Sequence, residues 1–333
     1  MNKIVVTVLA IIIFVIIVVF CYLFMGNAPV AKKITWGVNF SQMQAETLKL
    51  DWKETYLAIL ENLGVRNIKL ATQWDWVEGK QHDFYFDDID WQVQQAQAHN
   101  ANIIYVVGMK TGRWPECHAP NWAHSLSKSQ QQDEILQYIQ EVVERYKDSK
   151  AIVAWQAENE PLFQFGQCPW YDKDFLTKEV ALIKSLDPTR PIIVSDSGEQ
   201  SLWFSAAKIG DIVGVTMYRN VFFNVFGDMG FYATYPFPPV FYYRKAQLIE
   251  NFFNKKVISV ELQAEPWLSK PFVDTSVQEQ EKSMNLTQFK NNIEYAKQTG
   301  LDEFYFWGTE WWFWLKEKQN KPDIWNYARE LFK

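Results

Sequence analysis

Eight short β-rich runs alternate with segments of helical spacing after Lys33, and this alternation limits the fold more than any other feature of the sequence. Several runs are continuously apolar, such as Ile103–Val107, as expected of parallel strands that are covered on both faces. Eight β-α repeats in one domain of this size predict the α/β class and a single closed (β/α)8 TIM barrel. The competing fold is an open doubly wound sheet, but no Gly-x-Gly-x-x-Gly motif follows the first run.

The predicted strands and helices can be bounded from the same pattern. The strands are Ile34–Phe40, Asn67–Thr72, Asn102–Met109, Ala151–Glu158, Pro191–Asp196, Asp211–Tyr218, Lys256–Glu261 and Glu303–Trp307. Helical spacing covers Trp52–Leu63, Asp88–His99, Asp133–Tyr146, Lys173–Leu186, Arg244–Phe253 and Val277–Gln298. Gly64 and Gly300 are helix-stop signals before the second and eighth strands. The long connection at 221–240, rich in Phe, Tyr, Pro and Gly, is expected to be a lid, a binding loop or a membrane contact.

The first 25 residues differ from the rest. Ile4–Met25 is an uncharged run of 22 residues, which as a helix reaches about 33 Å and can cross a hydrocarbon core of about 30 Å. We therefore predict an N-terminal transmembrane helix in residues 1–25 as the membrane anchor, a short linker at 26–33, and one catalytic domain at 34–333. A signal peptide is the alternative, although its apolar region is usually shorter, about 7–15 residues. Lys3 on one side and Lys32 and Lys33 on the other leave the orientation undecided.

The charge and the content of aromatic, cysteine and histidine residues limit the kinds of molecule that the chain can bind. The net charge is −6 and no basic run exceeds two residues, so we expect no nucleic-acid partner. Aromatic residues make up 17% of the chain, including 16 Trp, and flat aromatic faces suit either sugar rings or an ordinary core. Cys117 and Cys168 fall in loops that leave the same face of the barrel, where they either form a disulfide or remain separate thiols. The four His have no spacing typical of a metal site.

Carboxylates follow or end two of the predicted strands. The fourth strand leads into Glu158-Asn159-Glu160-Pro161, and the seventh ends at Glu261. Reactive groups in such barrels lie at the carboxyl ends of the strands, so Glu160 and Glu261 are expected across one mouth. Glycoside hydrolysis needs such a pair, with one acid to protonate the departing oxygen and one carboxylate or activated water to take the anomeric carbon. The sequence thus indicates a glycosidase that needs no cofactor.

The position of Asn-Glu-Pro at residues 159–161, together with Glu261, resembles the retaining glycoside hydrolases of clan A, and the resemblance covers residues 34–333. Residues 74–79 followed by 84–90 are similar to the segment after strand two in the family 42 β-galactosidases. Residues 113–115 through 120–122 have the same character. A family 5-like and a family 42-like placement both remain open.

The resemblance implies roles for particular residues. It implies that Glu160 is the acid/base, that Glu261 is the nucleophile, and that Asn159 hydrogen-bonds the sugar 2-hydroxyl. It also implies that Tyr218 holds the nucleophile and that Trp307 is the floor of the sugar subsite. Further candidate substrate-binding residues are Trp74, Trp114 and Glu265. Double displacement requires carboxyl groups about 5–5.5 Å apart and a pKa of Glu160 raised toward roughly 6.

Several alternatives stay open at this point. Glu158 or Glu160 could belong to a structural ion network, and Glu265 rivals Glu261 as the nucleophile. Where the clan often has an arginine on strand two, this chain has Lys69, which keeps the charge but loses the bidentate fork. We expect an oligo- or polysaccharide substrate and a catalytic domain outside the cell membrane, held by a single span at residues 4–25. A non-catalytic, membrane-tethered carbohydrate-binding barrel is the rival function.

Overall fold

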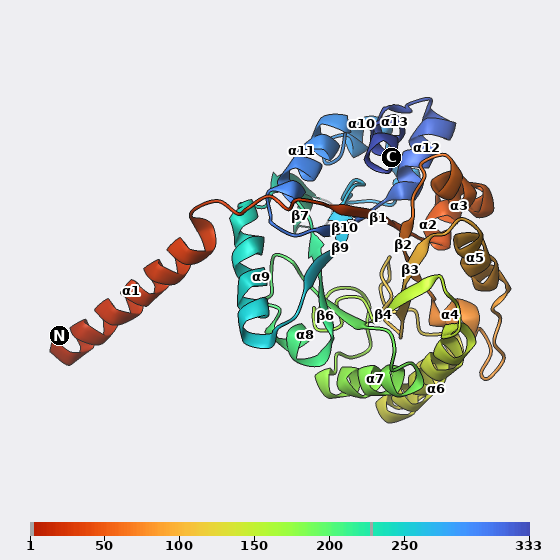
Figure 1. Cartoon of the computed structure of the whole chain (residues 1–333), viewed down its shortest axis with the longest axis horizontal. Coiled ribbons are helices and arrows are strands. Elements are labelled where there is room, and N and C mark those ends of the chain that lie inside the picture. The colour runs from red at the N-terminus through yellow and green to blue at the C-terminus, as the bar shows by residue number, and fades with distance from the viewer. Residues whose placement is uncertain (1–2, 227–228) are drawn as a thin grey trace.

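The computed structural model describes residues 3–226 and 229–333. Its centre is a closed barrel of parallel strands in the order β1-β10-β9-β6-β5-β4-β3-β2 (Figure 1). These strands are β1 (Thr35–Phe40), β2 (Asn67–Ala71), β3 (Asn102–Val107), β4 (Ile152–Ala157), β5 (Ile192–Asp196), β6 (Ile212–Met217), β9 (Val257–Gln263) and β10 (Glu303–Trp307). Each agrees with a predicted run to within two residues at either end, so the predicted TIM barrel is confirmed.

Helices surround the barrel on its outside (Figure 1). They are α2 (Gln42–Thr47), α3 (Trp52–Glu61), α4 (Trp74–Val77), α5 (Asp87–Ala98), α6 (Lys128–Tyr146), α7 (Lys173–Leu186), α8 (Phe204–Ile209), α9 (Pro239–Phe253), α10 (Val277–Gln280), α11 (Leu286–Lys297), α12 (Thr309–Gln319) and α13 (Asp323–Leu331), with 3-10 turns η1 (Asn121–Ser125) and η2 (Phe272–Asp274). A capping box between Ser127 and Gln130 starts α6. Gly64 and Gly300 have φ of 78° and 75°, a left-handed conformation that glycine adopts readily, and they end the predicted helical segments as expected.

Apolar side chains form two clusters. The larger one lies between the strands and the helices and includes Ile103 and Tyr105 of β3. The smaller one includes Ile104 of the same strand, with Ala154, Ile193, Ile258, Val260 and Tyr305 from other strands. Because successive side chains of a strand point to opposite faces, the smaller cluster fills the barrel interior. Polar residues replace this filling at the carboxyl ends of the strands, where the site lies.

The connection after β6, residues 221–240, contains strands that the sequence pattern did not predict. It contains an antiparallel hairpin of β7 (Asn220–Phe226) and β8 (Met229–Thr234), followed by the start of α9. Residues 227 and 228 lie outside the described part of the chain. The root of the hairpin is tied to β9, because Gln263 Oε1 accepts hydrogen bonds from the backbone N–H groups of Arg219 (2.8 Å) and Asn220 (2.9 Å).

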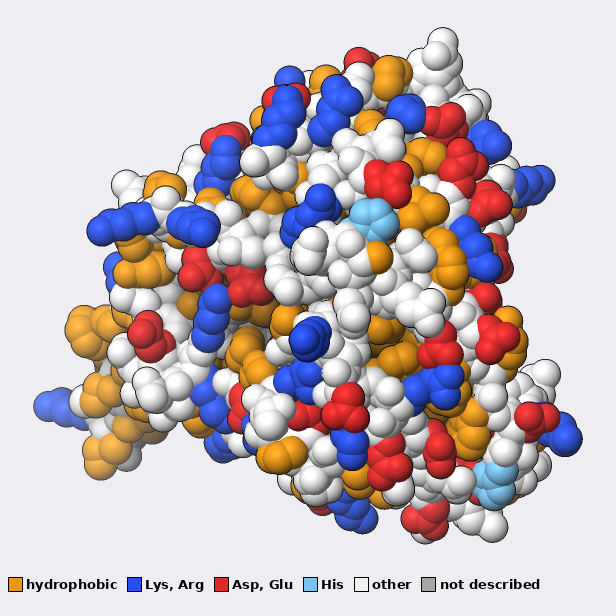
Figure 2. All heavy atoms as spheres, turned by 45° about the vertical axis from the view of Figure 1, so that its right-hand side comes forward, with side chains coloured by type: hydrophobic (Ala, Val, Ile, Leu, Met, Phe, Trp, Pro, Cys, Tyr) orange, Lys and Arg blue, Asp and Glu red, His pale blue; other side chains and the backbone are white. Residues whose placement is uncertain are grey.

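The N-terminal apolar run forms α1 (Lys3–Phe24), a helix that projects from the barrel domain (Figure 1). No residue of α1 is buried, and its hydrophobic side chains stand out at the lower left of the molecule in Figure 2. Among the described residues it is the one helix long and apolar enough to cross a membrane. Its last residue, Phe24, packs against Phe241 of α9, with ring centroids 5.2 Å apart.

Candidate active site

Glu160 and Glu261 lie at the same mouth of the barrel. Glu160 comes three residues after the end of β4 and is 8% exposed, whereas Glu261 lies within β9, which runs two residues further than predicted, and is 3% exposed. The Lys69 side chain links the two glutamates. Its ammonium donates to Glu261 (3.1 Å) and to Oδ1 of Asn159 (3.0 Å), which directly precedes Glu160 in the sequence. The charge of Glu261 is also one of the causes that raise the pKa of Glu160. The predicted pair is thus brought together, and the distance between the carboxyl groups stays a prediction.

Both oxygens of Glu261 have a donor. Lys69 lies 3.1 Å from Oε1, and the Tyr218 hydroxyl donates to Oε2 at 2.8 Å. Lys69 comes from the middle of β2, and Tyr218 directly follows β6. Lys69 stands where the resemblance leads us to expect an arginine. It still donates a hydrogen bond to the Glu261 carboxyl group. The two donors, one on each oxygen, fix the orientation of the Glu261 carboxyl group.

Glu160 lies in a different electrostatic environment. Burial raises the pKa of Glu160 to about 8, helped by the charges of Glu261 and Glu116 and opposed by Lys110. The Thr216 hydroxyl donates to Glu160 Oε1 at 2.9 Å, which lowers the pKa of Glu160 in part. The sequence prediction was a pKa near 6, so the direction agrees and the shift is larger. This carboxyl group holds its proton at neutral pH.

The backbone at the end of β4 is shaped to present Glu160. Glu158 and Glu160 both have positive φ, 54° and 46°, which is uncommon for residues with a side chain. The conformation is held from neighbouring strands, since the Glu160 N–H donates to Ser195 Oγ of β5 at 2.8 Å. Glu158 faces another way and accepts from the backbone N–H groups of Met109 and Lys110. Glu158 is therefore the structural carboxylate of this segment.

Trp307, at the end of β10, lies in the same site. The Arg113 guanidinium carbon is 4.2 Å from its ring centroid, and the Lys69 ammonium is 5.7 Å from it. Arg113 is held in turn by ion pairs to Glu265 and, at 3.2 Å, to Glu310. Glu265, the rival nucleophile, thus braces a loop arginine, whereas Glu261 carries the lysine and the tyrosine.

A hollow of about 310 Å³ is lined by Lys69, which donates to Glu261, although Glu160 and Glu261 themselves are not among its lining residues. Its walls come from the ends of β1, β2 and β10, from α4 and α5, and from the loop after β3. They include Asn39, Gln42, Lys69, Gln73, Trp76, Asp88, Thr111, Arg113 and Trp307. This mixture of aromatic rings with amide, hydroxyl and charged groups is typical of a site that binds a polar small molecule.

The two other tryptophans predicted to contact substrate lie in different places. Trp74 is fully buried, donates to Glu78 at 2.7 Å and packs against Trp122, so its side chain belongs to the core, contrary to the expectation. Trp114 is 62% exposed on the loop after β3. A series of ring contacts through Phe165 and Trp267 leads from Trp114 to Tyr218, which places Trp114 at the outer end of an aromatic wall of the mouth.

The sequence interpretation missed several residues of the site, namely Arg113, Glu116, Lys110, Ser195 and Thr216. Three of them lie in the loop after β3, where charged residues carry no periodic signal. Burial raises the pKa of Glu116 to about 8, in a field shared with Lys110 and Glu261. Ser195 and Thr216 lie in β5 and β6 and were recognisable as polar positions near the ends of buried strands.

Cys117 and Cys168 form a disulfide between the loop after β3 and the loop after β4. Of the two alternatives in the sequence, the paired one is therefore observed. The bond joins the loop that carries Arg113 to the segment that follows Glu160, so it connects two walls of the mouth.

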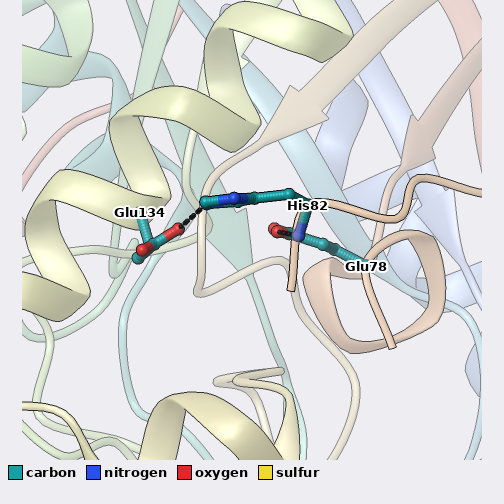
Figure 3. Close-up of side chains that lie close together, drawn as sticks. All are labelled: Glu78, His82 and Glu134. Carbon is teal, nitrogen blue, oxygen red and sulfur yellow. Dashed lines mark hydrogen bonds and ion pairs between the residues drawn. The ribbon is translucent and has the colours of Figure 1, made fainter. Parts of the chain in front are cut away.

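Glu78, His82 and Glu134 form a second cluster of titratable groups (Figure 3). One carboxylate oxygen of Glu78, one of Glu134 and one ring nitrogen of His82, the kinds of atom that bind metal ions, lie within 4.8 Å of one another. Each has a protein partner: Glu78 accepts from Trp74 and from the His82 backbone N–H, and Glu134 lies 3.1 Å from His82 Nε2. These bonds explain the cluster as a tie between the loop after α4 and helix α6.

Comparisons with known proteins agree with this architecture. Residues 105–265 match the family described as glycosyl hydrolases family 2, TIM barrel domain. A segment of 65 residues is 43% identical to the protein of Aspergillus flavus named "Probable mannan endo-1,4-beta-mannosidase F" and 38% identical to a mannosidase A of Aspergillus niger with the same type of name. The segment is 18% of this chain and spans only 13% and 16% of those proteins.

Solved structures share the fold at low sequence identity. A β-galactosidase from Rahnella sp. R3 has a TM-score of 0.60 at 11% identity over 92% of this chain and 57% of its own. A GH5_18 structure from Streptomyces cattleya has a TM-score of 0.57 at 11% identity, covering 83% of this chain and 70% of that one. A β-glucosidase from Exiguobacterium marinum has 0.55 at 12% identity, covering 84% and 89%.

Proposed function

This chain resembles the clan A glycoside hydrolases, with family 5 among its structural neighbours, and on that premise we propose that it is a retaining β-glycoside hydrolase. The observation that supports the proposal most is the contrast between two carboxyl groups at one mouth. Glu261 has the Lys69 ammonium and the Tyr218 hydroxyl on its two oxygens, whereas burial raises the pKa of Glu160 to about 8. Double displacement needs one carboxylate that attacks the anomeric carbon and one carboxyl group that donates a proton.

In the first step the Glu261 carboxylate attacks the anomeric carbon while Glu160 transfers its proton to the glycosidic oxygen. The bond between the anomeric carbon and that oxygen breaks, and the sugar becomes an ester of Glu261. Lys69 and Tyr218 orient the attacking carboxylate, because each is bonded to one of its oxygens. Asn159 hydrogen-bonds the 2-hydroxyl of the same sugar in this proposal, which its bonds to Lys69 and Gln156 (3.3 Å) support by fixing its side chain.

In the second step Glu160, now ionised, takes a proton from water, and the water oxygen attacks the anomeric carbon. The ester breaks, Glu261 returns as a carboxylate, and the product keeps the configuration of the substrate. In this proposal the hollow lined by Lys69 and Trp307 holds the sugars that stay bound through the ester, because Lys69 is bonded to Glu261. The partly exposed Trp307 ring supplies a flat surface for that sugar.

We further propose that the domain acts outside the cell membrane, with α1 as its single membrane span. The length and composition of α1 support the span. The disulfide between Cys117 and Cys168 supports the outward location, because disulfides persist in oxidising compartments. Polysaccharide and oligosaccharide substrates with β-linked mannose, glucose or galactose are the first to test, given the enzymes to which the chain is similar.

The full chain in detergent, assayed on aryl β-mannosides, β-glucosides and β-galactosides and on the matching oligosaccharides, tests the proposal. We expect hydrolysis of at least one class, a first product of retained configuration by NMR, and loss of turnover in Glu160→Gln and Glu261→Gln. Glu265→Gln is the matched control, and we expect it to keep the covalent step. Turnover that survives Glu261→Gln but disappears in Glu265→Gln would transfer the nucleophile to Glu265.

The rival function, a carbohydrate-binding barrel without turnover, predicts a different outcome. Such a protein would bind the same oligosaccharides with similar affinity before and after Glu160→Gln, and it would release no product. A raised pKa of Glu160, next to a second carboxyl group whose two oxygens each have a donor, has no use in simple binding, which is why we favour the hydrolase.

A further inference from the structure

The outward face of the β7–β8 hairpin is apolar and largely exposed in the described part of the chain. Phe223 and Phe231 pair across the two strands, with ring centroids 5.7 Å apart, and Val225 follows on the same face. These side chains are 37%, 56% and 52% exposed. A group of large apolar side chains that stays in water is unusual in a soluble domain and marks an interaction site.

The other face of the hairpin is attached to the protein. Phe222 packs edge-on against Tyr232, and the Tyr232 hydroxyl donates to Glu279 of α10 at 3.2 Å. The hairpin therefore has a fixed inner face and a free outer face. Because a two-stranded hairpin alone is only marginally stable, its inner contacts keep the outer face in place.

Ring contacts join the free face to the end of the apolar helix α1. Phe223 lies 5.8 Å from Tyr235, Tyr235 lies 5.9 Å from Phe237, and Phe237 lies 6.2 Å from Phe24, all measured between ring centroids. Phe24 is the last residue of α1. The apolar surface of the hairpin is thus continuous with the end of a helix that has the length of a membrane span.

The junction also carries groups that favour the polar boundary of a bilayer. The Arg244 guanidinium lies 5.1 Å from the ring of Tyr22 in α1 and 5.7 Å from the ring of Tyr243. Tyrosines and basic side chains gather at the boundary between hydrocarbon and water, where their apolar parts are buried and their polar ends are hydrated. The end of α1 therefore marks the level of the lipid headgroups.

We propose that the outer face of the β7–β8 hairpin rests in the boundary region of the lipid bilayer, beside the point where α1 enters it. This inference rests on α1 spanning the membrane and is independent of the glycosidase assignment. Its occupant is a lipid surface, because the face is flat, apolar and adjacent to the span. It gives the barrel a second membrane contact and so a fixed orientation.

That orientation affects the substrate. Tyr218, which holds Glu261, lies two residues before β7, and Gln263 of β9 bonds the root of the hairpin. The mouth of the barrel is therefore on the hairpin side, next to the bilayer. In this orientation the site reaches glycans close to the membrane surface.

A matched pair of labelled valines tests the contact. Val225 in the hairpin and Val153 near the start of β4 are 52% and 40% exposed. Each is changed to cysteine in a full chain with Cys21→Ala, which removes the one unpaired cysteine among the described residues and leaves the disulfide intact. Both are labelled with a polarity-sensitive fluorophore and reconstituted in vesicles of phosphatidylcholine and phosphatidylglycerol, with and without nitroxide-labelled lipid.

We expect a blue-shifted label at V225C that is quenched by the nitroxide lipid, and a label at V153C that stays in water. Resistance of the same samples to alkaline extraction reports separately on α1. If the protein remains with the vesicles while V225C is no more quenched than V153C, the hairpin contact is refuted and the span stands. If the protein is extracted, both the span and the contact are refuted.

Discussion

The ammonium of Lys69 lies 3.1 Å from Oε1 of Glu261, and the two side chains are 3% and 4% exposed. Both side chains are therefore removed from water, and each is the buried ion-pair partner of the other. Loss of one partner of a buried pair leaves an unpaired charge, which destabilises a protein by about 3–5 kcal/mol. Lys69 thus supplies a positive charge at the position where the clan that the sequence resembles often has an arginine.

Lys69→Met is expected to lower the melting temperature and to reduce kcat/KM on the order of 100-fold, as does loss of other preorganised charge partners. Lys69→Arg keeps the charge and should recover much of both. The control is Lys80→Met, whose side chain is 83% exposed in its pair with Asp83 and should change neither quantity measurably. Equal activity in Lys69→Met and wild type would contradict the role given to the pair.

Tyr218→Phe removes the second donor to Glu261. A hydrogen bond to a charged group contributes about 1.5–3 kcal/mol, so kcat/KM should fall by roughly 10- to 100-fold. The control is Tyr232→Phe in the hairpin, which removes a hydroxyl that donates to Glu279 of α10 and should leave the hydrolysis rate unchanged. Steady-state kinetics on the best aryl glycoside measures both, and similar losses in the two variants would argue against a specific role of Tyr218.

The pH profile should report the proton on Glu160. Burial raises the pKa of Glu160 to about 8, so the protonated, active form persists at neutral pH and kcat/KM falls as the pH rises through about 8. Thr216 donates to this carboxyl group and lowers its pKa. Thr216→Val should therefore move the alkaline limb to higher pH, and Thr216→Ser should leave it in place. An alkaline limb that stays in place in Thr216→Val would be inconsistent with Glu160 as the acid.

Glu179 of α7 should make the fold sensitive to alkali. It is fully buried, neither oxygen has a hydrogen-bond partner, and burial together with Glu158 raises its pKa well above the usual value. The folded state thus holds a proton that the unfolded state releases above about pH 4.3. Stability is full below that pH and falls as the pH rises toward the folded pKa, by up to about 1.4 kcal/mol per pH unit.

Glu179→Gln removes this titration. We expect its melting temperature to exceed that of the wild type by a margin that grows between pH 5 and pH 8, in thermal unfolding at fixed ionic strength. A margin that is constant with pH would show that Glu179 is ionised in the folded protein.

The disulfide should contribute mainly to stability. Its cysteines are 51 residues apart, and closing a loop of this length in the unfolded chain corresponds to about 4 kcal/mol in the chain-entropy treatment. The double variant Cys117→Ser and Cys168→Ser should melt at a lower temperature, and reductant should lower the melting point of the wild type but not that of the variant. Under reducing conditions the two proteins should melt at similar temperatures. Equal melting temperatures under oxidising conditions would refute the stabilising role of the disulfide.

The strands could be predicted from the sequence because both faces of a barrel strand are covered. Ile103–Val107 is apolar without interruption for this reason, and the helix stops at Gly64 and Gly300 define the connections. The hairpin at 220–234 could not be predicted in the same way. Its strands are aromatic on both faces, so the alternation that marks a half-buried strand is missing.

The site was predictable only where residues lie at strand ends. Glu160, Glu261, Asn159 and Tyr218 follow from that position, whereas Trp74 occupies the core although it belongs to a segment with a family-like pattern. Arg113 lies in a loop and contacts Trp307, Glu265 and Glu310 across the mouth. The spacing of residues in the sequence gives no indication of such contacts. Long-range ion pairs of loop residues become visible only when the barrel is closed.

In the proposed mechanism, the hollow lined by Lys69 should also affect the order in which the two halves of a substrate leave. It is lined by the loops of β1, β2, β3 and β10, so one half is clasped from several directions. The other half meets mainly the open aromatic rim near Trp114. The loosely held fragment should diffuse away during the lifetime of the ester, making room for water, and the clasped fragment should have the longer residence time and govern product inhibition.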